Sequence, residues 1–343
     1  MRCTPPEAPV NASASAAPLA LVALNLGGPD SLDAVQPFLR NLFADPDVIQ
    51  LGWLRPLQPL FARWISRRRA PLSRAAYEQI GGRSPILAET TAQIEAVAAR
   101  LTALGVPARP YVAMACWHPF SSEAVAAMQR DGVVRAIAVP MFPQYSFTTT
   151  ASSMKALQRA LAQAKAEIRL AEVRSYPAAD GFVTALAETV TEALATLPPS
   201  ARATAPVLFS AHGLPESYIR KGDPYLDEVR STVAAVTRRL ALGERARLTF
   251  QSRVGPQRWL SPYTEETLDE LAAAGEKAVV VVPVAFTGEH VETLQELDIV
   301  YRERASARGL TSFARARTVG THPAFIDALA ALAREAAVAR GWA

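Results

Sequence analysis

The chain has 343 residues, of which 50% are hydrophobic and 20% charged, and its formal net charge is +4. This composition excludes an intrinsically disordered protein and provides enough apolar residues for one large or two medium domains. So weak a charge gives no indication of nucleic-acid binding, and we expect no nucleic-acid partner.

The only cysteines are Cys3 and Cys116, and Cys3 lies in a leader rich in Pro, Ala and Ser. We therefore expect no structural disulfide, a reducing cytoplasmic location and no zinc or iron–sulfur cluster. The leader carries one Arg and no uninterrupted apolar segment before Leu19, which does not fit a secretory signal. Residues 1–18 are predicted to be disordered.

The first strand is predicted over Leu19 to Leu26, and the turn Gly27-Gly28-Pro29-Asp30 leads from it into a helix beginning near Ser31. This glycine pair lacks the G-x-G-x-x-G spacing of a dinucleotide site, and no G-x-x-x-x-G-K-[ST] occurs in the chain. The motifs therefore give no indication of an organic cofactor such as NAD or ATP.

Residues 51–69 combine tryptophan and leucine with a final run of three arginines, Arg67 to Arg69. Such a segment either lies in a membrane interface or forms the lip of an apolar pocket, and ordinary core packing beside a solvated basic end is the alternative. Peripheral contact with the inner membrane through this segment is one expectation.

Strands and helices then alternate to the end of the chain, with helices near residues 73 and 86–104 and a final helix from His322 to about Arg340. About four strands fall in each half, which predicts an α/β fold of two parallel-sheet domains facing one another. The boundaries are a leader at 1–18, a first domain at 19–160 with its lip at 51–69, a second domain at 161–320 and a C-terminal helix at 321–343. Six strand ends, in NLGGP, MACWHP, MFPQYS, SAHGLP, FQSRVGP and FTGEHVE, are expected to converge on one interdomain cleft.

The stretch from Ala278 to Tyr301 joins the most strand-like run of the chain to a cluster of acids. At about 100° per residue, Glu289, Glu292 and Glu296 share one helix face just past the carboxyl end of a buried strand, where open α/β sheets bind ligands. The alternative is a solvated helix start, in which acids favour the macrodipole.

Among four histidines, His212 stands out because it follows the buried run Val207-Leu208-Phe209 and precedes Gly213. Ser210 lies too close to it on one strand for a nucleophile with its base, so we discount a hydrolase triad. An imidazole facing several carboxylates suits either a divalent metal or the removal of protons.

The sequence resembles the ferrochelatases, which insert ferrous iron into a porphyrin as the last step of haem synthesis. The resemblance rests on stretches in the family's order between about Leu19 and Ile299, namely LNLGGPDSLDAVQPFLRNLF, YEQIGGRSPI, FPQYSFTTTASS, LFSAHGLPESYIRKGDPY, FQSRVGPQRWLSPYTEETL and VPVAFTGEHVETLQELDI. It implies two Rossmann-like domains with the porphyrin between them and no organic cofactor, Fe²⁺ being a substrate.

The resemblance also implies roles by position. His212 and Glu292 accept pyrrole protons and contact the metal, Glu296 and Glu289 continue an acidic path, and His290 lies behind them. Further matches are apolar contacts to the macrocycle at Leu26 and Trp259, and propionate-binding groups at Arg69, Tyr77 and Ser84.

One departure concerns MACWHPF, where Ala115 and Cys116 replace an Arg-Tyr pair that the family places across the porphyrin from His212. Cys116 is either a softer ligand in metal delivery or a small buried residue. The departure keeps open a non-catalytic or altered-metal porphyrin-binding or haem-binding paralogue. The choice between protoporphyrin and coproporphyrin, and between monomer and dimer, stays open, while the iron–sulfur dimer of some relatives is not expected.

Overall fold

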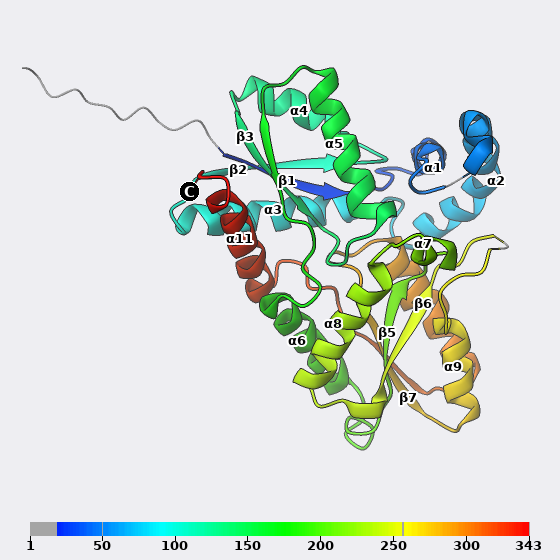
Figure 1. The fold of residues 1–343 in the computed structure, drawn as a ribbon. Coiled ribbons are helices and arrows are strands. Elements are labelled where there is room, and N and C mark those ends of the chain that lie inside the picture. The colour runs from blue at the N-terminus through cyan, green and yellow to red at the C-terminus, as the bar shows by residue number, and fades with distance from the viewer. Residues whose placement is uncertain (1–18, 50, 256, 343) are drawn as a thin grey trace, which may run out of the picture.

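The computed structural model describes residues 19–49, 51–255 and 257–342. The predicted disordered leader at 1–18 lies outside the described residues. Figure 1 shows two sheets, one above the other, with helices around both.

The first sheet has the order β2-β1-β3-β4, and all its pairs are parallel. Its strands are β1 (Leu19–Asn25), β2 (Ala108–Met114), β3 (Arg135–Pro140) and β4 (Arg169–Glu172). The segments between them include α1 (Val35–Ala44), η1 (Gly52–Leu57), α2 (Gln58–Gln79), α3 (Ile86–Ala103), α4 (Ser121–Arg130), η2 (Phe147–Ala151) and α5 (Ser152–Gln163).

The second sheet has the order β6-β5-β7-β8 and is also parallel. Its strands are β5 (Val207–His212), β6 (Ala246–Gln251), β7 (Ala278–Pro283) and β8 (Ser312–Arg315). Around it lie α6 (Asp180–Thr196), α7 (Glu216–Arg220), α8 (Tyr225–Arg239), η3 (Gly243–Arg245), α9 (Thr264–Ala273), η4 (Glu292–Tyr301), α10 (Arg302–Ala307) and α11 (Pro323–Val338). The predicted two-domain α/β architecture with four parallel strands in each sheet is confirmed.

The apolar runs explain why these segments form central strands. Every residue of β1 and β7 is buried, as expected for β-branched and small apolar side chains covered on both faces of a parallel sheet. One cluster of buried side chains extends from β1 and α3 through α11 and α6 to β5 and β7. The two sheets therefore share a continuous core, and α11 contributes to it from beside both (Figure 1).

One strand was assigned to the wrong half. The predicted boundary near residue 160 puts the strand at residues 169–172 in the second domain, but β4 pairs with β3 at the edge of the first sheet. The alternation of strands and helices predicts that a strand forms, but it does not say which sheet the strand joins. The change of sheet therefore falls between Glu172 and Val207 instead of near residue 160.

Two other expectations need correction. The lip from Gln58 onward and the helix predicted near residue 73 form one continuous helix, α2, which contains Pro71. The short strand β8 was not predicted, because four residues with only one fully buried side chain carry little periodic signal.

The loops at the carboxyl ends of the two sheets meet. The amide of Gln144 donates to the carbonyl of Val284 at 3.2 Å, and the hydroxyl of Thr287 donates to the carbonyl of Met141 at 2.9 Å. Nearby, the Gln93 amide donates to the carbonyls of Thr287 and Gly320. These buried hydrogen bonds fix the relative position of the two domains.

Candidate active site

His212 is the last residue of β5, and its ring is held from several sides. Its Nδ1 lies 2.7 Å from the carbonyl oxygen of Gly213. The hydroxyl of Tyr225 donates to the backbone carbonyl of His212 at 3.0 Å. The Trp259 ring lies 6.4 Å away, centroid to centroid. Gly213 is required there, because a β-carbon would lie 3.2 Å from that indole and 3.0 Å from a backbone oxygen.

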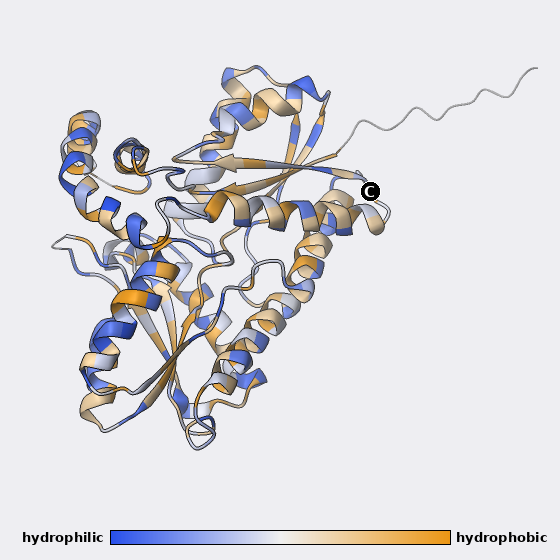
Figure 2. Cartoon of the chain, turned by 180° about the vertical axis from the view of Figure 1, so that it is seen from behind, coloured by the Kyte–Doolittle hydropathy of each residue, from blue (hydrophilic) through white to orange (hydrophobic). Residues whose placement is uncertain are grey.

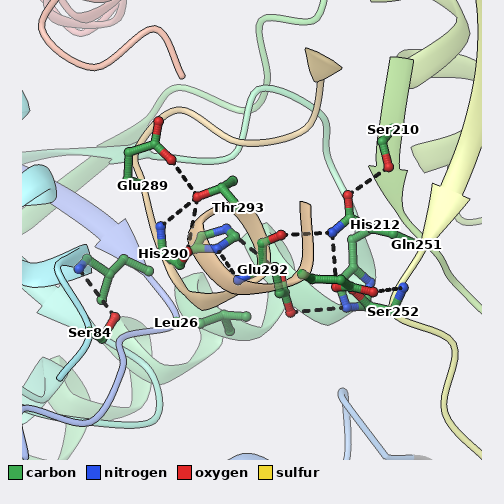
Figure 3. Close-up of polar contacts among 12 residues, drawn as sticks. Leu26, Ser84, Ser210, His212, Gln251, Ser252, Glu289, His290, Glu292 and Thr293 are labelled. Carbon is green, nitrogen blue, oxygen red and sulfur yellow. Dashed lines mark hydrogen bonds and ion pairs between the residues drawn. The ribbon is translucent and has the colours of Figure 1, made fainter. Parts of the chain in front are cut away.

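His212 and Glu292 form an ion pair, with Nε2 3.5 Å from Oε1 (Figure 3). Burial opposes the charge on the imidazole, but the neighbouring Glu292 carboxylate outweighs it and raises the pKa of His212 to about 9. Burial likewise opposes the charge on Glu292, and the imidazole of His212 lowers the pKa of the carboxyl to about 2. At neutral pH the site therefore holds an imidazolium beside a carboxylate.

His290 stands behind this pair. Its Nδ1 accepts the backbone N–H of Glu292 at 3.0 Å, its Nε2 lies 3.8 Å from Glu292 Oε2, and its ring meets Phe286 edge-on. Burial lowers the pKa of His290, so this imidazole is neutral and orients Glu292 without competing for its charge.

Glu296 lies one turn further along η4 and is enclosed by donors. Its Oε1 accepts the backbone N–H of Ser252 at 3.0 Å and the hydroxyl of Tyr301 at 3.0 Å. Its Oε2 accepts the amide of Gln251 at 3.1 Å and the hydroxyl of Ser252. Burial and the charge of Glu292 nevertheless raise the pKa of Glu296 above its usual value.

Glu289 does not share the face of the other two acids, so the predicted single stripe is wrong. It precedes the helix, and η4 has π-helical rather than α-helical geometry, which changes the angle between successive side chains. Its carboxylate meets Arg315 at 3.0 Å and accepts hydrogen bonds from Thr293 and Thr318. Burial alone would raise the pKa of Glu289, but the charge of Arg315, together with these hydrogen bonds, lowers it below the usual value.

Three of the predicted substrate contacts lie around the ion pair. The Trp259 ring lies beside the His212 ring, tilted by 55° from it. Tyr77 is buried in an apolar cluster to which Leu26 and Val291, the residue before Glu292, also belong. Burial, with the nearby charge of Glu292, raises the pKa of Tyr77, which keeps its phenol protonated.

The other two predicted contacts differ in accessibility. The hydroxyl of Ser84 accepts the backbone N–H of Ile86 at 3.3 Å and lies so close to Gly28 that no β-carbon would fit there. Arg69 is half-buried on α2, and within the described parts of the chain its guanidinium has no ion-pair partner.

The lip segment, η1 with the first half of α2, is strongly exposed. Exposure reaches 88% for Trp53, 67% for Leu60 and 57% for Trp64, which excludes ordinary core packing of these side chains. Leu60 and Trp64 line a surface hollow together with Arg63, Arg67 and Arg68. Figure 2 shows hydrophilic and hydrophobic residues side by side along α2.

Cys116 lies on the first-domain side, in the same apolar cluster as Tyr77 and Leu26, and is 1% exposed. Burial, with a smaller contribution from Asp45, raises the pKa of the Cys116 thiol to about 12. A protonated, enclosed thiol favours the small-buried-residue alternative over that of a thiolate ligand.

Sequence reasoning missed the groups that hold the acids in place. Gln251 and Ser252 stand in the stretch FQSRVGP, but nothing in their residue types signals a contact with Glu296. Arg315 was missed because β8 was missed. A cation in that strand, opposite the acids after β7, was the available signal.

The structure brings together His212 and Glu292, the two groups to which the resemblance assigns contact with the metal. Across residues 19–49, 51–255 and 257–342, no group of three or more His, Cys, Asp or Glu side chains is arranged to hold a metal ion. Nor does any helix in these ranges have the length and apolar character needed to cross a membrane.

Comparisons with known proteins identify the family of the chain. The family model described as Ferrochelatase matches residues 18–337. The ferrochelatase of Geotalea daltonii is 44% identical over 92% of this chain and 97% of its own length, and that of a Synechococcus strain is 45% identical over 91% of each.

Among solved structures, SirB from Bacillus subtilis with Fe³⁺ superposes with a TM-score of 0.53 at 13% identity, covering 94% of this chain and 98% of its own. This likeness concerns the fold alone. Because the family model spans nearly the whole chain and both relatives exceed 40% identity over more than nine-tenths of their lengths, the chain belongs to the ferrochelatase family.

Proposed function

We propose that the chain inserts ferrous iron into protoporphyrin IX, with His212 and Glu292 as the groups that exchange protons and contact the metal. Membership of the ferrochelatase family makes it a metal chelatase of haem synthesis. The observation that carries the finer proposal is the ion pair of His212 and Glu292, held at 3.5 Å beside Trp259.

Insertion of Fe²⁺ displaces two pyrrole protons, so the site must take up two protons while a dication arrives. The resting pair already carries one proton, on His212, because its pKa is raised to about 9. A dication close to the imidazolium disfavours the charged ring, so His212 releases its proton when the metal enters. Its Nε2 lone pair is then free to contact the metal or accept a pyrrole proton, while the Glu292 carboxylate offers the second acceptor.

In this proposal Glu296 receives protons from the pair and passes them on. The amide of Gln251 bonds both the Glu296 carboxylate and the Glu292 backbone carbonyl, so the two acids are held on a common support. Glu289, kept ionised by Arg315, supplies a further negative charge on the same segment and completes the acidic path.

The macrocycle would lie between this acidic wall and the first domain. Leu26 and Trp259 supply apolar contacts, and Arg69, whose guanidinium has no ion-pair partner among the described residues, is the cation proposed for a propionate. Tyr77 and Ser84 are the neutral donors proposed beside it. Binding energy from these contacts is available to bend the ring and expose its nitrogens.

We also propose that the exposed lip makes peripheral contact with membranes. Tryptophan and leucine beside several arginines suit an interface with anionic headgroups. Co-sedimentation with anionic vesicles, but not with neutral ones, is the expected result. The proposed reaction requires no organic cofactor and no iron–sulfur cluster.

The reaction is tested anaerobically with purified protein, Fe²⁺ or Zn²⁺, and either protoporphyrin IX or coproporphyrin III. The Soret and Q bands should change to those of the metalloporphyrin over many turnovers, faster with protoporphyrin. Absence of metallation above background with both metals and both porphyrins would contradict the proposal. Faster turnover of coproporphyrin would correct only the substrate.

Ala115 and Cys116 motivate a second candidate, a non-catalytic or altered-metal porphyrin-binding protein. It predicts tight, spectrally visible porphyrin binding without Fe²⁺ insertion, and repeated turnovers with Fe²⁺ would exclude it. The matched variant replaces Ala115 by Arg and Cys116 by Tyr. A changed rate or metal preference would show that this departure alters the chemistry, whereas unchanged values would remove the reason for the second candidate.

A further inference from the structure

The Glu296 carboxylate accepts four hydrogen bonds, two on each oxygen. Ser252 supplies two of the donors, its backbone N–H to Oε1 and its hydroxyl to Oε2, while Gln251 and Tyr301 supply the others. A backbone N–H and an amide NH₂ can only donate. An ionised carboxylate accepts all four bonds, whereas a protonated acid would have to donate to the hydroxyl of Ser252 or Tyr301 and would lose that group as a donor, so the arrangement favours the ionised form.

Ser252 adopts an unusual backbone conformation to make its two bonds. Its φ is +64°, in the left-handed region that costs a residue with a β-carbon roughly 1 kcal/mol. Only two other non-glycine residues in the described ranges have a positive φ, Lys165 and Ala241, each just after a helix. Ser252 instead lies directly after a strand, and the conformation turns both its N–H and its hydroxyl toward Glu296.

A chain of buried hydroxyls fixes the orientation of Gln251. Its Oε1 accepts the hydroxyl of Ser210 at 2.7 Å, Ser210 also bonds Thr264, and Thr264 bonds Thr249, all with almost no exposure (Figure 3 shows the Ser210–Gln251 bond). With Oε1 so occupied, the amide NH₂ of Gln251 must point at Glu292 O and Glu296 Oε2. This network explains why Ser210 lies two residues before His212 without taking part in the chemistry.

The same turn also positions the loop that carries Trp259. Two residues after Ser252, the carbonyl of Val254 accepts the indole N–H of Trp259 at 2.9 Å, and this indole packs over Gly213 beside His212. The left-handed turn at Ser252 thus helps to set the position of Glu296, behind the ion pair, and of the Trp259 ring, beside it.

We propose that Ser252 is a positioning residue that holds Glu296 as an oriented, ionised carboxylate ready to receive protons from the His212–Glu292 pair, with Gln251 as its buried support. This inference rests on the proposed function. It adds a role for two residues whose side chains contact Glu296 rather than the porphyrin or the metal.

The charges around Glu296 make these neutral donors necessary. Glu292, on the same helix, raises the pKa of Glu296, and Tyr301 keeps its proton. His212 is engaged by Glu292, Arg253 pairs with Glu265 and Glu266, and Arg315 pairs with Glu289 and Asp298. Hydrogen bonds from Ser252 therefore offset part of the burial and repulsion that favour protonation of Glu296.

The test measures kcat for Zn²⁺ insertion into protoporphyrin IX from about pH 5 to about pH 9 in Ser252→Ala and Ser252→Gly. Both variants lose the hydroxyl and keep the N–H, and the glycine variant also removes the left-handed strain, so it should fold even if the alanine variant does not. Loss of one charge-assisted hydrogen bond is expected to move the acidic limb of the pH–rate profile up by about one unit. At high pH, where Glu296 ionises again, kcat should return toward wild type.

Two controls make the result specific. Ser200→Ala, an exposed serine in a distant loop, should leave the profile unchanged. In a Glu296→Gln background, Ser252→Ala should cause no further shift of the acidic limb, because the titrating group is gone.

An active wild type whose acidic limb does not move in either Ser252 variant would overturn the inference alone, as would a uniform loss of kcat at every pH, which is the sign of a merely structural role. A shift that persists without Glu296 would also overturn it. An inactive wild type would overturn the proposed function and this inference together.

Discussion

Two regions of the molecule differ in how their side chains are satisfied. The acidic wall is formed by the end of β5, the end of β6, Glu289 and η4. It has a partner for each of its charges: His212 for Glu292, Arg315 for Glu289 and four neutral donors for Glu296. The lip at η1 and α2 instead leaves Trp53, Leu60 and Trp64 mostly exposed.

The difference assigns separate roles to the two regions. A wall whose charges are paired by hydrogen bonds and ion pairs within the protein is preorganised, which is the property that favours chemistry. Covering exposed apolar side chains with a ligand or another surface lowers the free energy, which is the property that favours binding. Changes in the wall should therefore affect turnover or folding, and changes in the lip should affect affinity.

The largest effect on folding is expected from Arg315→Leu. Arg315 is 10% exposed and bonds both Glu289 and Asp298, so its removal leaves Glu289 without a cation and Asp298 with Arg302 alone. We expect a loss of about 3 kcal/mol in the free energy of unfolding, seen as a Tm lower by several degrees. The loss should shrink at low pH, where Glu289, whose pKa Arg315 lowers in the wild type, becomes protonated.

Arg317→Leu is the matched control, because Arg317 pairs with Glu192 at the surface, where both side chains are about half exposed. It should cost less than about 1 kcal/mol. Equal losses in the two variants would mean that the buried cation of the wall is no more important than a surface one.

A medium effect is expected from the lip. Replacing Leu60 and Trp64 together by Ser should raise the Kd for porphyrin about 10- to 100-fold, because both exposed side chains lose apolar area that the ligand covers. Fluorescence quenching of the porphyrin measures the Kd. The kcat at saturation and the Tm should stay near wild type, since neither side chain supports the fold.

Val338→Ser serves as the control for the lip, because Val338 is also exposed but lies on α11, on the opposite side of the molecule from α2 (Figure 1). If this variant weakened porphyrin binding as much as the lip variant did, general surface hydrophobicity rather than the lip would account for affinity.

The smallest effect is a pH-dependent contribution of the ion pair to stability. The raised pKa of His212, about 9 against an ordinary 6.5, stabilises the fold fully below pH 6.5, and this contribution is lost as the pH rises through 9. The lowered pKa of Glu292, about 2 against 4.5, stabilises it fully above pH 4.5, and this contribution is lost as the pH falls through 2. Both stabilising contributions apply in full only between pH 4.5 and pH 6.5.

Thermal unfolding of wild type and Glu292→Gln across pH measures this contribution. The Tm gap should be widest near the middle of that window and narrow toward pH 9. It should not exceed a few degrees, because both side chains are about one-third exposed and solvent screens the pair. A gap that widens toward pH 9 would contradict the assigned charges.

The sequence predicted most of the fold because the strands are strongly patterned. Val279 to Val282 is a continuous run of β-branched residues, which indicates a central parallel strand, and β7 does lie between β5 and β8. The assignment of β4 to the wrong half and the omission of β8 have one cause: pairing between strands is a tertiary property, and short edge strands carry few buried side chains.

The candidate site was predictable where residue type and position coincide, as for His212 at a strand end and the acids after β7. The resemblance to a family, rather than spacing, proposed that His212 faces Glu292. The expectation of one acidic stripe failed because it assumed an α-helix. The hydrogen-bond donors around Glu296 could not be predicted, because a serine gives no indication of the left-handed backbone conformation that Ser252 adopts.

The most direct test of the division between wall and lip is His212→Ala, with kcat for Fe²⁺ insertion and the Kd for protoporphyrin measured on one preparation. We predict that kcat falls at least about 1,000-fold while the Kd stays within about 3-fold of wild type, since His212 acts on protons and metal rather than on the bulk of the ring. Wild-type turnover in this variant, or a loss of binding equal to the loss of rate, would contradict the account.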